Sequence, residues 1–214
     1  MYKHVIVGEG KHDLWFLHEI VTKNRMIGGN SCAVYLELRA FERDVNIEEQ
    51  PQLSFINGGG SPTVKVSVRT TRPFWIRNIQ MMLGVVGDTD TGSIYEKLKT
   101  YLDAFLRDEK RHPVLTPTVD FDDEEKSFIL KPKADREIPV WTSEVPISLE
   151  HQVAKALKAK YKIDSSLNED ETILRAANKL NKTKEEVIRN STILLKKEKW
   201  FEDLRKKLSN KLSL

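Results

Sequence analysis

The chain has 214 residues, of which 39% are hydrophobic and 31% are charged, and its formal net charge is +3. This length supports one good core and a second, smaller one, and the composition is typical of a globular protein. A single cysteine, Cys32, excludes a disulfide framework and a thiolate metal site, and no apolar run approaches the ~18 residues that cross a bilayer.

Charge is distributed unevenly along the chain. Residues 1–145 hold 19 Lys and Arg against 22 Asp and Glu, whereas residues 146–214 hold 16 against 10. A basic tail suggests an anionic partner, although a solvated, lysine-rich helix face explains the same charge. Because an apolar strand follows directly after the first few residues, we expect no signal peptide, a cytoplasmic location and no membrane partner.

The first apolar run, His4 to Val7, predicts a buried strand that leads into Gly8-Glu9-Gly10. Apolar residues then recur at helical spacing, which predicts a helix over 11–22 and hence the opening of a βαβ unit. The glycines leave the backbone bare beside Glu9, so that a ligand or metal can approach closely. The spacing matches neither a Walker loop nor a dinucleotide fingerprint.

The next segment, about 26–52, is interpreted as an insertion. Alternation of apolar and polar residues from Val34 to Arg39 favours a half-exposed strand, with a short helix as the alternative, and the polar residues 42–51 favour a loop. Residues 53–57 then form a second core strand.

A glycine-rich turn follows that strand. Ser61 is a good N-cap and Pro62 a good first helical residue, so a helix is expected over 64–72. Free amides at such a helix start can bind an anion, which makes the turn a candidate phosphate-binding site; a tight turn that needs glycine is the alternative. The residues concerned are Gly58, Gly59, Gly60 and Ser61. Arg69 and Arg72, one turn apart on the expected helix, either line a phosphate path or are plain surface charge.

The third strand is expected over 79–87 and is followed by two aspartates, Asp88 and Asp90, with one residue between them. Ser93 and Glu96 have the spacing of a capping box, so a helix is expected from there to a point before Pro113. Further strands are expected over 114–121, 127–131 and 138–141, the last of them completing the sheet.

From residue 148 onward the pattern is helical throughout. Helices are expected over 149–161, 172–180, 183–195 and 200–212, the third with a capping box from Thr183 to Glu186. We therefore divide the chain into an α/β domain over 1–145 and a basic helical region over 146–214. The cations of that region proposed to contact nucleic acid are Lys196, Lys197, Lys206 and Lys207.

Three carboxylates stand at the expected carboxyl ends of strands, which is the edge where open α/β sheets bind ligands. They are Glu9, Asp88 and Asp90. Acidic oxygen ligands of this kind suit Mg²⁺. Because a carboxylate crowded by others has a raised pKa, such a group is also suited to proton transfer.

This combination resembles the Toprim family of topoisomerases, bacterial-type primases, small Toprim nucleases and overcoming-lysogenization-defect nucleases. The resemblance covers about residues 1–145 and rests on three short stretches, 5–13, 55–59 and 85–90. It implies a Rossmann-like fold with a four-stranded parallel sheet flanked by helices. It also implies that Asp88 and Asp90 bind Mg²⁺ or Mn²⁺, and that Glu9 is a general acid or base or a further metal ligand.

The chain departs from the family pattern in one place. Many members carry a third acidic residue where this chain has Gly92. Asp13 is a candidate accessory ligand, although its charge is also simply favourable at a helix N-terminus, and Lys11 is a candidate phosphate contact or part of a solvated helix start. Nothing in the sequence resembles the additional domains of a topoisomerase or a primase.

Three functions are consistent with these patterns. The first is Mg²⁺-dependent hydrolysis or transfer of a phosphodiester in DNA or RNA. The second is a non-catalytic Toprim scaffold that binds nucleic acid or a protein partner through its basic tail. The third is a metal-dependent enzyme on a small phosphorylated substrate, since α/β folds host many chemistries.

Overall fold

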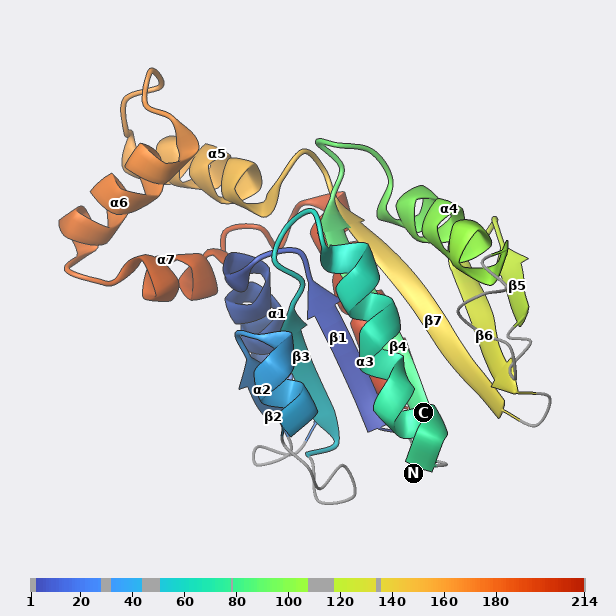
Figure 1. Cartoon of the computed structure of the whole chain (residues 1–214). Coiled ribbons are helices and arrows are strands. Elements are labelled where there is room, and N and C mark those ends of the chain that lie inside the picture. The colour runs from blue at the N-terminus through green and yellow to red at the C-terminus, as the bar shows by residue number, and fades with distance from the viewer. Residues whose placement is uncertain are drawn as a thin grey trace.

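A seven-stranded, mostly parallel sheet forms the centre of the protein (Figure 1). The structure is a computed structural model that describes residues 3–27, 32–43, 51–77, 79–107, 118–133 and 136–213. The strand order is β2-β3-β1-β4-β7-β6-β5, in which the first five strands pair in parallel and β6 pairs antiparallel with both β7 and β5. The strands are β1 (Lys3–Gly8), β2 (Cys32–Tyr35), β3 (Leu53–Asn57), β4 (Met81–Asp88), β5 (Thr118–Asp122), β6 (Ser127–Lys133) and β7 (Arg136–Val145).

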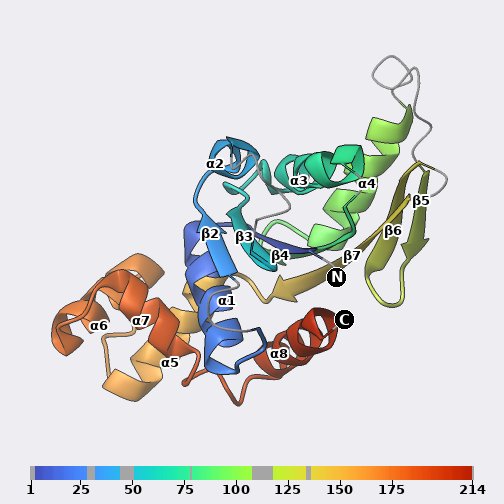
Figure 2. The ribbon, with the colours of Figure 1, turned by 90° about the horizontal axis from the view of Figure 1, so that it is seen from below.

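Helices cover both faces of this sheet (Figure 2). One face carries α2 (Leu38–Arg43), α3 (Thr63–Arg77) and α4 (Ile94–Arg107), and its hydrophobic cluster includes Phe74, Tyr95 and Leu98. The other face carries α1 (Lys11–Lys23) and α8 (Lys199–Leu212). The expected α/β architecture with a mainly parallel sheet and flanking helices is therefore confirmed.

The C-terminal part is helical, as expected. Its helices are α5 (Leu149–Tyr161), α6 (Glu169–Leu180), α7 (Lys184–Ser191) and α8. The predicted box at the start of α7 is present, with the Thr183 hydroxyl accepting from the Glu186 N–H and the Glu186 carboxylate accepting from the Thr183 N–H. These helices share one hydrophobic cluster with α1 and the sheet, which includes Leu17, Trp141 and Leu208.

Several elements differ in detail from the sequence-based expectations. The segment after residue 31 forms both alternatives in succession, strand β2 and then helix α2, and β2 extends the parallel part of the sheet from the implied four strands to five. Helix α3 begins at Thr63, one residue before the expected range of 64–72, and continues to Arg77 past Pro73. The expected helix end before Pro113 and the first residues of the strand over 114–121 lie outside the described residues.

Across the described ranges, no helix combines the length and apolar character needed to span a membrane.

Candidate functional site

The carboxyl ends of β1 and β4 bring Glu9 and Asp88 together. The two strands are parallel neighbours, with Gly8 paired to Val86, so both chains leave the sheet at the same edge. The Glu9 N–H donates to the Val86 carbonyl oxygen at 3.1 Å, and Glu9 Oε2 accepts from the Asp88 N–H at 2.9 Å. The backbone therefore orients the glutamate toward the end of β4.

Space for the Glu9 side chain depends on a glycine. A Cβ atom placed on Gly87 would lie 3.1 Å from Glu9 Oε2 and 3.2 Å from Ile94 Cγ1. Such contacts are tight for a real Cβ, so a larger residue at this position would have to displace the carboxylate. Gly87 is therefore part of the site, because its lack of a side chain leaves space for the Glu9 carboxylate.

Asp13 lies in the first turn of α1 and is 5% exposed. Its Oδ2 atom accepts from the Gly10 N–H at 2.7 Å. Burial raises the pKa of Asp13 well above the usual range of an aspartate, and the negative charges of Asp88, Glu150 and Glu9 raise it further. Its position is more than that of a favourable charge on the helix dipole, because it faces the other carboxylates.

Asp88 is half-buried at the end of β4. Burial raises its pKa to about 7, with further contributions from the charges of Glu150 and Glu9. Its Oδ1 atom accepts a hydrogen bond from the Leu149 N–H at 3.2 Å, which lowers the pKa and partly offsets the rise. The first turn of α5 therefore points a backbone N–H at this carboxylate.

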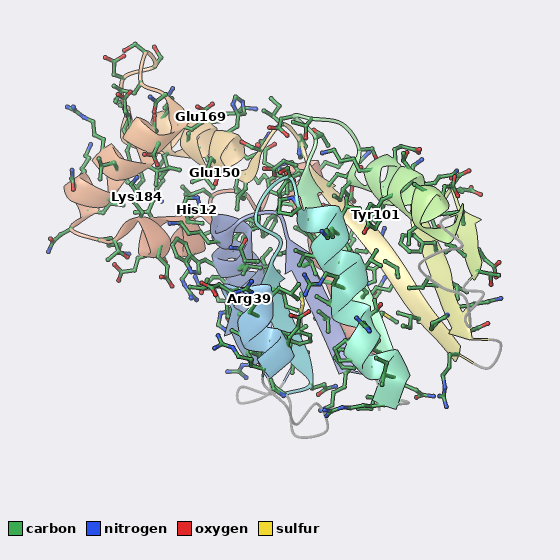
Figure 3. All side chains as sticks on the ribbon, viewed as in Figure 1. His12, Arg39, Tyr101, Glu150, Glu169 and Lys184 are labelled. Carbon is green, nitrogen blue, oxygen red and sulfur yellow. The ribbon has the colours of Figure 1, made fainter. Side chains whose placement is uncertain are left out.

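Glu150 is a fourth carboxylate at this edge, and no motif in the sequence indicates it. Its Oε1 atom lies 2.6 Å from His12 Nδ1, across the contact between α5 and α1. Figure 3 labels the two residues on these helices. The hydrogen bond from His12 holds the pKa of Glu150 below its usual range. In the sequence this residue is only an acid in the first turn of a helix, a common feature that carries no sign of its contact with His12, 138 positions earlier.

Asp90, by contrast, lies on the exposed turn after β4. Among the charges that raise the pKa of Asp88, that of Asp90 contributes least. The turn is braced against the loop after β7, because the Asp90 N–H donates to the Ile147 carbonyl at 3.0 Å and the Ile147 N–H donates to Thr89 Oγ1 at 2.8 Å. Gly92, in the place of the missing acid, has φ of 101° in the left-handed region that favours glycine.

The glycine-rich turn after β3 contacts the loop that carries Glu9. The Gly58 N–H donates to the Gly8 carbonyl and the Gly60 N–H to the Glu9 carbonyl, both at 2.7 Å, while the Gly59 N–H donates to Asn57 Oδ1 at 3.0 Å. These three amides are engaged within the protein. In this structure the turn braces the Glu9 loop, and Ser61 lies instead on an open groove between α3 and α4.

In the described part of the chain, none of the basic residues singled out from the sequence pairs with these carboxylates. Arg69 pairs with Glu42 of α2 at 2.7 Å, and Arg72 is exposed on the same helix. Lys11 lies with its Nζ atom 5.8 Å from the centre of the Trp15 ring. Of the tail cations, Lys206 pairs with Glu202, Lys207 donates to the Glu125 carbonyl, and Lys196 and Lys197 are exposed before α8.

The acidic cluster, Glu9, Asp13, Asp88 and Glu150, has little cationic compensation. In the described part of the chain, the only basic side chain paired with any of its members is His12, through Glu150. Mutual repulsion and burial are costs that a cation between the carboxylates would relieve. Oxygen donors are the ligands that Mg²⁺ prefers, so the donor set fits a hard divalent cation in chemistry.

The arrangement is not a preformed cage for a metal. Among the described residues, no three His, Cys, Asp or Glu side chains are grouped in a way that holds a metal ion by themselves. One oxygen of each of Glu9, Asp13 and Asp88 already accepts from a backbone N–H. Since Mg²⁺ is commonly held by one or two carboxylates together with water and substrate phosphate, a three-residue cage is not a requirement for its binding.

Comparison with protein-family models, with curated proteins and with solved structures returned no match to this chain.

Proposed function

We propose that this protein cleaves or transfers phosphodiester bonds of DNA or RNA with Mg²⁺ or Mn²⁺, through a Toprim-type site. The observation that carries the proposal is the convergence of Glu9, Asp13 and Asp88 with Glu150 at the carboxyl ends of β1 and β4. Burial and, secondly, the charges of Glu150 and Glu9 raise the pKa of Asp88 to about 7, a perturbation that is more common at functional sites than elsewhere.

Asp88 and Asp90 are the residues proposed to hold the cation, with Asp13 as an accessory ligand. A divalent ion there supplies neutralisation of phosphate charge and activation of water. Asp88 Oδ1 accepts a hydrogen bond from the Leu149 N–H, and we propose that its other carboxylate oxygen binds the cation. Asp90, being exposed, is accessible from solvent at the rim of the same turn.

Glu9 is the residue proposed to move a proton, or to act as a further ligand. Its Oε2 atom is held by the Asp88 N–H, so the side chain is oriented before any substrate binds. Burial and the neighbouring carboxylates raise the pKa values of Asp13 and Asp88, so the cluster retains a proton closer to neutral pH, which suits acid or base chemistry there.

The test is a cleavage assay on single- and double-stranded DNA and RNA, with Mg²⁺ or Mn²⁺. We expect metal-dependent cleavage that Asp88→Asn lowers by at least ~100-fold, on the order of what a single electrostatic contact contributes to catalysis. Asp203→Asn in α8 is the matched control, because that aspartate is exposed and remote from the cluster. Cleavage by the Asp88→Asn variant at the wild-type rate would refute the proposal.

A second candidate function is a non-catalytic Toprim scaffold that binds nucleic acid or a protein partner through the basic tail. The lack of a preformed three-ligand group in the described chain, together with Gly92, favours it. Deleting the tail is a poor test because α8 is part of the core. Charge reversal of Lys196 and Lys197, both exposed, leaves the core intact, and a mobility-shift titration at two salt concentrations then measures their share of nucleic-acid binding.

A further inference from the structure

A cleft of about 630 Å³ lies on the α1 and α8 side of the sheet. Its walls come from the end of α1, the segment between α7 and α8, and the first two turns of α8. The volume falls within the range of small-molecule sites. Glu19, the first lining residue on α1, is six residues after Asp13, so the cleft and the acidic cluster are separated by roughly 9 Å of helix.

The lining of the cleft is partly apolar. Its exposed apolar side chain is Ile193, at 53%, whereas Ile20 and Phe201 beneath it are 1% and 3% exposed. Trp200 lies beside Phe201 with 6.0 Å between ring centres. An organic body of about the size of a ring system can therefore rest on hydrocarbon here and remove Ile193 from water.

The rim of the cleft has an excess of positive charge. Of its acidic residues, Glu19 pairs with Lys23 and also lies 3.6 Å from Arg189, and Glu202 pairs with Lys206. Within the described part of the chain, no carboxylate lies within ion-pair distance of the other two lining cations, Lys196 and Arg205; Arg205 acts on Glu202 only from a distance. These two cations come from different segments, the α7–α8 connection and α8.

The carbonyl group of Ile20, near the C-terminal end of α1, is not free to repel an anion in the cleft. Carbonyl groups at a helix C-terminus repel negative charge, but the Ile20 carbonyl already accepts from both the side chain and the backbone N–H of Asn24. The Asn24 carboxamide keeps its oxygen as an acceptor on the cleft wall.

We propose that this cleft binds a small phosphorylated ligand with a flat apolar body, of the size of a nucleoside monophosphate. Lys196 and Arg205 hold the phosphate, because a group with up to two negative charges matches two unpaired cations, and Arg is well shaped for phosphate oxygens. Ile193, the exposed apolar side chain of the lining, contacts the apolar body. This site is separate from the acidic cluster and does not depend on its activity.

Isothermal titration of the full-length protein with adenosine monophosphate, in EDTA, tests the proposal. We expect one saturable site per chain, at least tenfold weaker binding of adenosine and of inorganic phosphate, and at least tenfold weaker binding of adenosine monophosphate by the Lys196→Met/Arg205→Met variant. Ile193→Trp, which fills the cleft from an exposed position, should also abolish binding. Thermal melting checks that each variant is folded.

Two matched variants serve as controls. Lys197→Met changes an exposed neighbour that does not line the cleft, and Asp88→Asn changes the acidic cluster; both should bind adenosine monophosphate as the wild type does. Absence of binding by the wild type, equal binding of adenosine, or wild-type affinity in the Lys196→Met/Arg205→Met variant would each overturn the proposal. Loss of binding in Asp88→Asn would place the ligand at the acidic cluster and would overturn it as well. Failure of cleavage activity has no bearing on these results.

Discussion

Glu9 Oε2 accepts a hydrogen bond from the N–H of Asp88, a residue 79 positions later in the chain. The carboxylate after β1 is thus oriented by the last residue of β4, and the two acids proposed for catalysis share one structural contact. This contact separates the structural role of Glu9 from its chemical role, because a neutral side chain can preserve the hydrogen bond while losing the charge.

Two substitutions of Glu9 make that separation. Glu9→Gln keeps an oxygen for the Asp88 N–H and should retain the wild-type melting temperature, whereas Glu9→Ala leaves that N–H without its partner and should cost about 1–2 kcal/mol. Both variants should lose cleavage activity. Denaturant unfolding and the nuclease assay measure the two effects, and an active Glu9→Gln variant would remove Glu9 from the chemistry.

Asp88→Asn should stabilise the metal-free protein. The substitution removes a half-buried charge that Glu150 and Glu9 repel, while an amide oxygen still accepts from the Leu149 N–H. After allowance for solvent screening we expect a gain of about 1 kcal/mol at pH 8 in EDTA.

The same variant should lose the response to Mg²⁺. A ligand at 100 times its Kd raises wild-type stability by about 2.7 kcal/mol, and this increment should be absent without the Asp88 charge. Thermal melting with and without Mg²⁺ measures both effects, with Asp203→Asn as the control. A wild-type melting temperature that does not change with Mg²⁺ or Mn²⁺ would argue against a metal site.

Gly84→Ala should weaken the centre of the sheet. A Cβ at this position of β4 would clash with the indole ring of Trp141 on β7, so the ring has to move within a packed core. Overpacking of this kind costs about 1–3 kcal/mol. At Gly10 the nearest heavy atom would be 3.5 Å away, an ordinary contact, so Gly10→Ala is the control and urea unfolding is the measurement.

Leu208→Ala tests whether α8 is part of the main core. Leu208 is fully buried in the hydrophobic cluster that joins α1, the sheet and the C-terminal helices, and truncation of such a leucine costs about 2–5 kcal/mol. Leu174 of α6 is 45% exposed, so Leu174→Ala should change stability by about 0.5 kcal/mol or less. Equal effects of the two substitutions in a denaturant titration would mean that α8 is loosely attached.

His18 should make stability fall in mild acid. Its ring lies edge-on to Phe55, and Nδ1 accepts from Arg189 at 3.1 Å. Burial and, secondly, the Arg189 charge lower the pKa of His18, while Glu19 and Glu185 oppose the effect. Because the folded pKa is below the unfolded one, stability is complete above pH 6.5 and decreases as the pH falls through 6.5 toward the folded pKa.

The comparison that isolates His18 is a pH series of melting temperatures for the wild type and His18→Gln. Burial also lowers the pKa of His4, so part of the pH dependence should remain in the variant. A wild-type curve that is flat between pH 5 and 7 would contradict this assignment, as would identical curves for the two proteins.

Local pattern was sufficient for most individual elements. Apolar runs and glycine turns predict β1, β3, β4 and the helices that follow them. Strand burial and helix capping depend on residues that are close in the sequence, so a local pattern reveals them. The capping box from Thr183 to Glu186 appears where its spacing predicts it. The position of Glu9 and Asp88 at one edge also follows from sequence, once two parallel strands are assumed to be neighbours.

Only the tertiary structure decided what surrounds those two acids. Glu150 enters the cluster because α5 packs beside α1 and its first turn meets His12, a contact between positions 138 apart that no local pattern encodes. Asp13 joins the acidic cluster because the fold buries its side chain. The glycine turn after β3 donates backbone hydrogen bonds to the loop that carries Glu9. The sequence by itself determined the strand ends and the types of residues that stand there; charge, burial and the pKa of Asp88 depend on packing between distant segments, and only the folded chain determined them.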